Sequence, residues 1–212
     1  MGKLILLGAV ILVAQFVNAE GLALDEFERV SIVALTNSAQ LCSSVFSNIV
    51  EVAIESTNED LKVDGYLMKG VKARHKFFET AEAVCLLEEY IAVSNAVEIA
   101  DDFTNNWRKW SSRLMLAGCY ASGGSFHRSY GVLTNGLSRM STEGFSGTSN
   151  ELATALLMKF EMSGVSIPIA YKIMAGMSAA EMGLQTEARR CASQVPLDFA
   201  QLIETILNAK DY

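Results

Sequence analysis

The scarcity of helix-breaking residues is the feature that most constrains the fold of this chain. Only two prolines, Pro168 and Pro196, occur among 212 residues. Proline interrupts a helix because it lacks a backbone N–H and clashes with the preceding turn. No stretch alternates polar and apolar residues for long enough to indicate a strand. We therefore predict an all-α protein, a single-domain bundle of about seven or eight helices.

Three sets of apolar residues each recur at the spacing of one helix face. They are Cys42, Phe46, Ile49, Val50 and Ala53; Phe77, Ala81, Val84, Leu87 and Ile91; and Phe199, Leu202, Ile203, Ile206 and Leu207. The first set predicts a buried stripe. The polar run Thr57–Asp60 is expected to end one helix and to cap the next, and Asp198 to cap the last.

The second half of the chain shows where helices begin and end. We predict helices over Phe126–Met140, over Leu152–Met162 and from about Pro168 to Gly183. A capping box that starts at Thr148 opens the second of these, and proline suits the first turn of the third. Asn135-Gly136 indicates either a turn or a flexible point inside the first.

The N-terminal residues have the pattern of a secretory signal. Lys3 precedes the apolar run Leu4–Val13, and Val17–Ala19 places small residues before a cleavage point. An apolar core of about 10 residues is too short to cross a bilayer, which takes about 20. We therefore expect a signal peptide at 1–19 and a secreted, extracellular helical domain at 20–212, with no membrane contact in the mature form.

All four cysteines lie in the mature part of the chain: Cys42, Cys85, Cys119 and Cys191. An even number in a secreted protein predicts two disulfides, and the sequence leaves three pairings open. The alternative is four buried thiols. Each bridge would contribute about 3–4 kcal/mol by closing a long loop. The cysteines are too far apart for a zinc ribbon or a CxxC pair. We predict a disulfide-stapled bundle.

The charge of the chain argues against some partners. Cleavage removes Lys3 from the 17 basic residues and leaves 16 against 24 acidic ones, a net charge of about −8. An acidic protein gains nothing from counterion release on nucleic acid and is repelled by anionic membranes. We therefore expect no nucleic-acid partner.

The residue types that carry catalysis do not form a known pattern. Neither His75 nor His127 has a second histidine one turn away, so the spacing of zinc hydrolases is absent. The adjacent pairs Glu88-Glu89 and Asp101-Asp102 point apart on a helix, which favours surface roles. The sequence shows no nucleophile elbow and no phosphate-binding loop. We predict no catalytic, cofactor-binding or metal-binding residues, and no enzyme.

Two further groups of side chains favour packing roles over binding roles. Trp107-Arg108-Lys109-Trp110 is interpreted as an anchor at the core edge with two snorkelling cations; the alternative is a stacking platform for bases or sugars. Five methionines at helical spacing indicate core, or otherwise the lining of a small-molecule cavity or partner surface. They are Met158, Met162, Met174, Met177 and Met182.

The C-terminal half of the chain has a pattern of helical hairpins. A helix over Leu152–Val165 ends in Ser-Gly-Val, and Ser178–Leu184 follows in an Ala- and Gly-containing helix; Ser111–Gly118 is similar in kind. This pattern resembles the helical domains of spider silk proteins. The chain departs from those proteins in having no long repetitive tract, more charge and four cysteines. A small silk-associated protein fits better than a silk protein itself. The resemblance implies a non-enzymatic role in gland storage or fibre assembly.

Together these observations favour a secreted structural protein that assembles through helical surfaces. Burial of apolar helix faces between copies would drive assembly, and acidification or salt would promote it by reducing self-repulsion. Its expected partners are further copies of itself or other fibre proteins. The alternative is a secreted helical carrier of a small apolar ligand.

Overall fold

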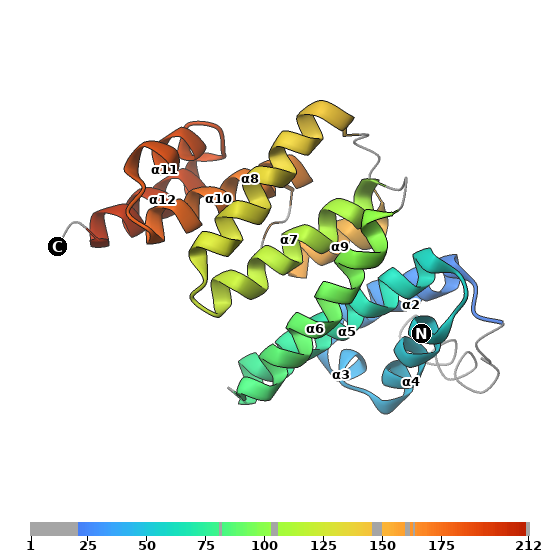
Figure 1. The fold of residues 1–212 in the computed structure, drawn as a ribbon. Helices are drawn as coiled ribbons and strands as arrows, with labels where there is room; N and C mark the ends of the chain where they lie inside the picture. The colour runs from blue at the N-terminus through green and yellow to red at the C-terminus, as the bar shows by residue number, and fades with distance from the viewer. Residues whose placement is uncertain are drawn as a thin grey trace. The chain divides into compact units, whose positions relative to one another are not determined.

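The structure is a computed structural model that describes residues 21–80, 82–102, 106–145, 150–159, 162 and 164–210. These residues contain eleven helices and no strand (Figure 1), which confirms the all-α prediction. The helices are α2 (Leu24–Thr36), α3 (Ser38–Leu41), α4 (Ser44–Glu55), α5 (Glu59–Thr80), α6 (Ala83–Asp101), α7 (Asn106–Ser122), α8 (Phe126–Glu143), α9 (Glu151–Lys159), α10 (Ile167–Glu181), α11 (Gln185–Ala192) and α12 (Leu197–Lys210). The predicted signal peptide, 1–19, lies outside the described residues.

The number of helices exceeds the seven or eight predicted, because helices such as α3 and α11 are too short to show a periodic stripe. Contacts between the helices also group them into two compact units, whereas we predict a single bundle. The first unit comprises Met1–Arg108 and Ser149–Ser163, and the second Lys109–Thr148 and Gly164–Tyr212. The first boundary falls inside α7, so no Pro- or Gly-rich linker marks it in the sequence.

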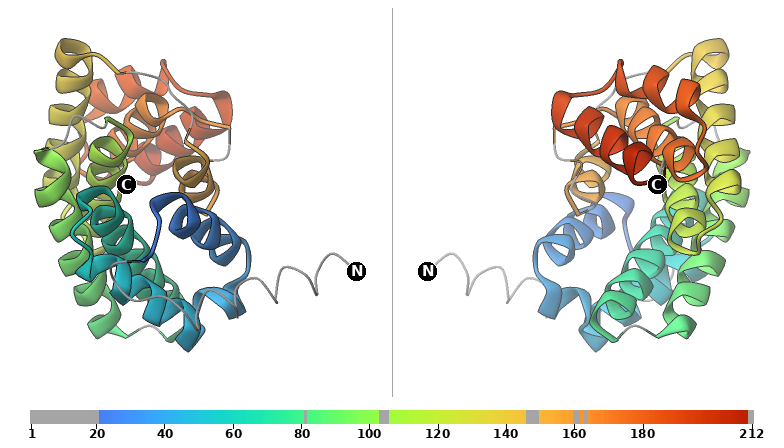
Figure 2. Two further views of the ribbon diagram at one scale, coloured as in Figure 1. Left: turned by 90° about the vertical axis from the view of Figure 1, so that its right-hand side faces the viewer. Right: turned by 90° about the vertical axis from the view of Figure 1, so that its left-hand side faces the viewer.

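In the first unit, α5 and α6 lie side by side and α4 packs against α5 (Figure 2). A glycine permits the approach of α4: a Cβ at Gly65 would lie 3.0 Å from the side chain of Ile54. The helix α2 packs mainly against α9 and α3. The large, fully buried side chains of this unit are Phe27, Leu41, Phe46, Leu61, Leu67, Met68 and Leu152.

The first predicted stripe is confirmed at four of its five positions. Phe46, Ile49, Val50 and Ala53 are buried on α4. Cys42 is exposed, because it precedes the helix: Ser43 caps α4, and its hydroxyl accepts a hydrogen bond from the Phe46 N–H at 3.1 Å. The expected cap of the next helix is also present, since Asn58 accepts from the Leu61 N–H at the start of α5.

The second predicted stripe does not form a single helix face. α5 ends at Thr80 and α6 begins at Ala83, so the residues before and after this break belong to different helices. Val84, Leu87 and Ile91 follow one another along α6 and are exposed. Phe77 is half-buried on α5, and Ala81 lies outside the described residues.

In the second unit, α10 is the central helix and contacts α8, α11 and α12. Two glycines allow these contacts. A Cβ at Gly136 would lie 2.3 Å from the Tyr171 ring, and one at Gly176 would lie 2.6 Å from Ile203. Asn135-Gly136 therefore lies inside α8, as one of the two alternatives has it, and Gly136 is the point where Tyr171 approaches the helix. Around α11 and α12 the core consists of Ala179, Ala180, Ala188, Ala192, Ile203 and Leu207.

The predicted helix starts in the second half are correct to within a few residues, but two caps differ. Asn150, rather than Thr148, caps α9, and its side-chain oxygen accepts from the Ala153 N–H at 3.1 Å; Thr148 lies outside the described residues. Pro168 stands in the first turn of α10 as predicted. Asp198 lies within the first turn of α12 rather than at its cap.

Candidate functional site

The four cysteines do not form disulfides in the structure. Cys42 is an exposed thiol, and Cys85, Cys119 and Cys191 are buried. Cys191 packs inside the second unit, where its Cβ lies 2.9 Å from the position that a Cβ on Gly176 would take. The predicted disulfide staples are thus absent from this structure, and the four cysteines sit on separate helices and loops.

The tryptophan cluster is part of the core. Trp107 is 6% exposed and Trp110 is fully buried, so neither ring offers a face on which a base or sugar could stack. The cations beside them do not snorkel to solvent: Arg108 and Lys109 are buried as well. The Arg108 guanidinium lies over the Trp107 ring at 4.4 Å from its centroid. The interpretation of the tryptophan cluster as a core anchor is confirmed, and the prediction that its two cations snorkel to solvent is wrong.

Arg108 is buried because three carboxylates surround it. Its Nε and Nη2 donate to the two oxygens of Asp64 at 2.8 and 2.9 Å, and Nη2 also donates to Glu28 at 2.7 Å. The Asp60 carboxylate lies 3.2 Å from Nη1. This group ties α2, α5 and the start of α7 together, which a surface ion pair could not do.

The charges of this cluster shift the pKa values of its members. Burial raises the pKa of Asp64 to about 7; the hydrogen bonds and charge of Arg108 oppose this change, while Glu28 and Asp60 add to it. Burial lowers the pKa of the Arg108 guanidinium, but the hydrogen bonds to Asp64 and the charges of Asp64, Asp60 and Glu28 together raise it overall. Arg108 thus stays charged, and Asp64 takes up a proton near neutrality. Arg108 and Asp64 are buried, whereas the Glu28 and Asp60 side chains remain partly exposed.

The adjacent carboxylate pairs lie in different surroundings. Glu89 is buried on α6 and accepts from Arg74 Nε of α5 at 2.6 Å, so its predicted surface role is wrong. Glu88 is exposed at the surface, as predicted. Asp101 and Asp102 are exposed at the end of α6. Neither pair forms an acid–base dyad.

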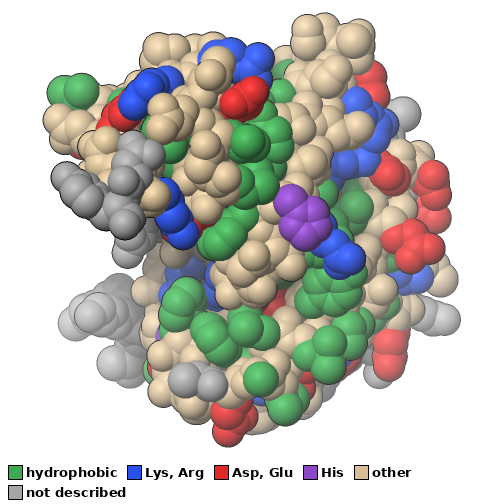
Figure 3. All heavy atoms as spheres, turned by 60° about the vertical axis from the view of Figure 1, so that its left-hand side comes forward, with side chains coloured by type: hydrophobic (Ala, Val, Ile, Leu, Met, Phe, Trp, Pro, Cys, Tyr) green, Lys and Arg blue, Asp and Glu red, His purple; other side chains and the backbone are tan. Residues whose placement is uncertain are grey.

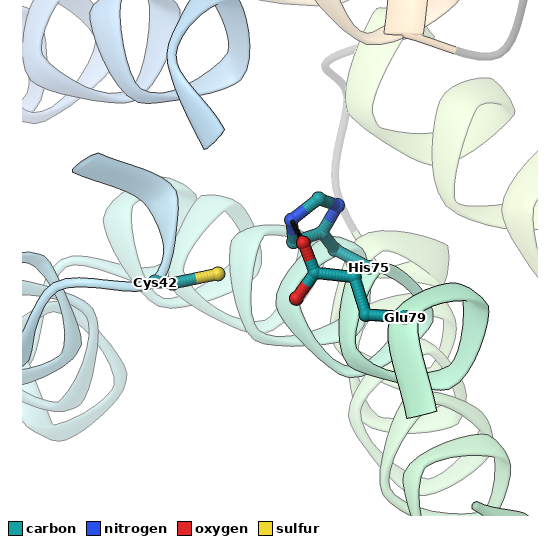
Figure 4. Close-up of side chains that lie close together, drawn as sticks. All are labelled: Cys42, His75 and Glu79. Atoms are coloured by element: carbon teal, nitrogen blue, oxygen red, sulfur yellow. Dashed lines mark ion pairs between the residues drawn. The ribbon is translucent and has the colours of Figure 1, made fainter. Parts of the chain in front are cut away.

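The two histidines differ in what surrounds them. His127 is exposed in the first turn of α8, as predicted. His75 is largely buried on α5 and meets two other potential metal ligands, Cys42 and Glu79 (Figure 4). The sequence does not reveal this group, because Cys42 is remote in the chain from the other two residues. The spacing of His75 and Glu79, four residues apart on a predicted helix, is the one sequence signal that pointed to it.

An exposed apolar stripe runs along α6. We call Val84, Leu87 and Ile91 the α6 stripe; their side chains are 63%, 59% and 51% exposed. They follow one another at intervals of three and four residues, which places them on one helix face. Phe78, near the end of α5, is exposed as well. Apolar side chains also reach the surface in patches on the face drawn in Figure 3.

A cavity of about 490 Å³ adjoins the α6 stripe between α4, α5 and α6. Lys69, Lys72 and Lys76 line it from α5, and Ile91 lines it from α6. Lys69 pairs with Glu51 of α4 at 2.9 Å. Burial, and to a lesser degree the neighbouring Lys76, lowers the pKa of Lys72. A row of cations thus borders the stripe in a protein that is acidic overall.

A second, more apolar groove lies between α2 and α9, with a volume of about 760 Å³. Ile32, Leu35, Ala155 and Met158 provide its apolar lining. Of the five predicted methionines, only Met158 lines this groove; Met174 and Met177 are half-buried on α10, Met182 follows that helix, and Met162 lies after α9. The methionines therefore do not gather around one cavity.

None of the helices in the described part of the chain has the length and apolar character to span a bilayer. Comparison of the chain with models of protein families, with curated proteins and with solved structures finds no match.

Proposed function

We propose that this chain is a secreted, non-enzymatic structural protein that self-associates through its helical surfaces. The observation that carries the proposal is the α6 stripe. Three large apolar side chains in a row expose area that association would remove from water, which contributes about 25 cal/mol per Å². Contiguous exposed apolar area of this kind is typical of interaction sites rather than of isolated surface residues.

A second copy of the chain is the partner that the surroundings of the stripe favour. The row of Lys69, Lys72 and Lys76 beside it complements an acidic surface, and the chain itself is strongly acidic. In a twofold pairing the same patch serves both copies, so the lysines of one copy can face acidic side chains such as Glu88 of the other. The overall negative charge opposes association, so we expect acid or salt to favour it.

Export and a fibre-forming secretion are parts of the proposal that rest on the sequence. The signal-peptide pattern at 1–19 supports export, and the resemblance to helical silk domains supports a role beside a fibre. Disulfides belong to the same expectation, and peptide mapping under non-reducing conditions tests them. Detection of the protein in a spun fibre, rather than in body fluid alone, tests the fibre role; its absence from fibres would contradict it.

The self-association test compares two variants with the same change of charge. Leu87→Glu places a carboxylate in the α6 stripe, and Leu197→Glu places one at a position on α12 that is 70% exposed. We expect Leu87→Glu to raise the dissociation constant at least about tenfold, because a carboxylate would be buried in an apolar contact, and Leu197→Glu to leave it nearly unchanged. Analytical ultracentrifugation over a range of concentrations measures this.

Two outcomes would overturn the self-association proposal. One is a wild-type protein that stays monomeric at every concentration. Light scattering between about pH 5 and 8 and across salt concentrations extends this test, because particle size should grow as net charge is neutralised or screened. The other is an equal weakening by both variants, which would show that net charge rather than the α6 stripe controls association.

The α2–α9 groove favours a carrier of a small apolar ligand as the second candidate. Its volume is in the range of ligand sites, and apolar side chains provide much of its lining. A fluorescent apolar probe distinguishes the two functions. Saturable one-to-one binding that Ala155→Trp abolishes supports a carrier. Oligomers that grow with concentration, without stoichiometric probe binding, support the structural role.

A further inference from the structure

Three side chains with metal-binding atoms meet where the end of α3 approaches the C-terminal part of α5. The sulfur of Cys42, a ring nitrogen of His75 and a carboxylate oxygen of Glu79 all lie within 4.8 Å of one another. Figure 4 shows the Cys42 sulfur pointing toward the pair on α5. We propose that these three residues bind a zinc ion. The proposal depends on neither export nor self-association.

The backbone holds the three ligands in place before any metal binds. His75 and Glu79 are four residues apart, so they occupy the same face of α5 on successive turns. Cys42 is the C-terminal cap of α3, and its N–H donates to the Ser38 carbonyl at 3.1 Å. The next residue, Ser43, caps α4. Two helix ends therefore fix the position of Cys42, and a site on such rigid elements needs little ordering when the ligand arrives.

The contact between His75 and Glu79 has a geometry that suits a bound cation. Nε2 of the ring lies 2.9 Å from Oε1 of the carboxylate. Nε2 is shielded from solvent, and its direction toward the carboxylate does not meet hydrogen-bond geometry, so it lacks a hydrogen-bond partner among the described residues. In the tautomer that leaves Nε2 without a proton, two lone pairs face each other at this distance and repel. A proton between them would form only a bent bond, whereas a metal ion would accept both lone pairs and that of the sulfur.

The chemistry of the three donors selects zinc. Thiolate and imidazole are ligands of zinc and other borderline-soft metals, while magnesium and calcium prefer oxygen alone. One thiolate and one carboxylate balance the charge of a divalent ion. Zinc bond lengths of about 2.0–2.3 Å place tetrahedral ligands roughly 3.3–3.8 Å apart. Side-chain rotation can bring these atoms to that spacing, and three protein ligands leave the fourth position to water.

Zinc and a disulfide compete for Cys42. The metal binds the thiolate, so a sulfur that is joined to another cysteine is lost as a ligand. Cys42 is the exposed thiol among the four, so it is accessible both to a metal ion and to thiol reagents. The site therefore requires the reduced protein, and metal binding should protect Cys42 from thiol reagents.

The test titrates the full, reduced chain with Co²⁺ and then displaces it with Zn²⁺. Cobalt is the probe because a thiolate ligand gives it a charge-transfer absorption band. The variants are Cys42→Ser, His75→Gln and Glu79→Gln. The matched controls are His127→Gln, at the other histidine, and Glu98→Gln, at an exposed carboxylate of α6. Far-UV circular dichroism of each variant verifies that it is folded.

We expect one metal ion per chain and a charge-transfer band that Cys42→Ser abolishes. Each ligand variant should weaken zinc binding at least about tenfold, the lower end of the loss seen even for outer-sphere partners, and the controls should stay within about twofold of the wild type. Saturable binding should also raise the melting temperature. Absence of saturable binding, survival of the band in Cys42→Ser, or equal weakening by the controls would overturn the proposal.

Discussion

The first unit buries a charge between α2, α5 and Arg108, whereas in the second unit glycines let α10 lie close against its neighbours. In the first, Arg108 is enclosed by Glu28, Asp60 and Asp64. In the second, Gly136 and Gly176 let helices approach until a single Cβ would clash. Charge pairing depends on pH and on every partner, while close packing depends on volume. The two units should therefore respond to different changes.

Removal of the buried cation should have the largest effect. Arg108→Met keeps the apolar stem but leaves Asp64 buried without its partner, which costs about 3–5 kcal/mol. The matched control Arg189→Met removes an exposed arginine of the second unit, with a cost within about 0.5 kcal/mol. Denaturant unfolding measures both losses.

Hydrogen exchange resolved by peptide then measures the stability of each unit separately. Exchange in α5 and α6 should accelerate in Arg108→Met more than exchange in α10 to α12. Equal acceleration in both units would show that they unfold as one, and the contrast between them would fail.

The first unit should become less stable as pH rises, because the folded state holds a proton on Asp64 more tightly than the unfolded chain does. Its pKa in the folded state, about 7, lies above the unfolded value of 3.8. The unfolded chain therefore releases this proton first, and the contribution of Asp64 to the unfolding free energy, on the order of 4 kcal/mol, is lost between about pH 4 and 7.

The control for this pH dependence is Asp64→Asn, which keeps an acceptor for Arg108 and does not titrate. The difference in unfolding free energy between wild type and variant, measured from pH 4 to 8, isolates the contribution of Asp64. A wild type that gains stability over this range relative to Asp64→Asn would contradict the assignment.

The addition of a methyl group should have opposite effects on stability at packed and at open positions of α8 in the second unit. Gly136→Ala pushes a Cβ against the Tyr171 ring, whose hydroxyl donates to the Trp110 carbonyl at 2.8 Å. We therefore expect the unfolding free energy to fall by about 1–3 kcal/mol. Gly131, also on α8, has open space around it, and Gly131→Ala should stabilise the protein by about 0.5–1 kcal/mol. Melting temperatures measure both; shifts of the same sign would show that α8 is not packed as described.

Local signals in the sequence predicted most helices. The apolar face of α4, the cap at Asn58 and the proline at the start of α10 each act within one or two turns, so neighbours in the chain suffice to reveal them. The caps at Asn150 and near Asp198 were misplaced by a residue or two, because several polar residues compete there for the same role.

Interactions between distant residues could not be predicted in the same way. The pattern of Val84, Leu87 and Ile91 indicates a helix face but not whether another helix covers it. Arg108 and Asp64 are 44 residues apart, and nothing near either one shows that they pair. The sequence predicts a disulfide for Cys42, and nothing in it indicates that this thiol lies beside His75.

The sequence alone determined that the described chain is helical and where most helices begin, because hydrogen bonding and capping act between near neighbours. The tertiary structure decided which faces are covered, which charges are buried and which thiol meets an imidazole. Those outcomes depend on free-energy differences between alternative packings of the same helices, and such differences arise only when distant segments come into contact.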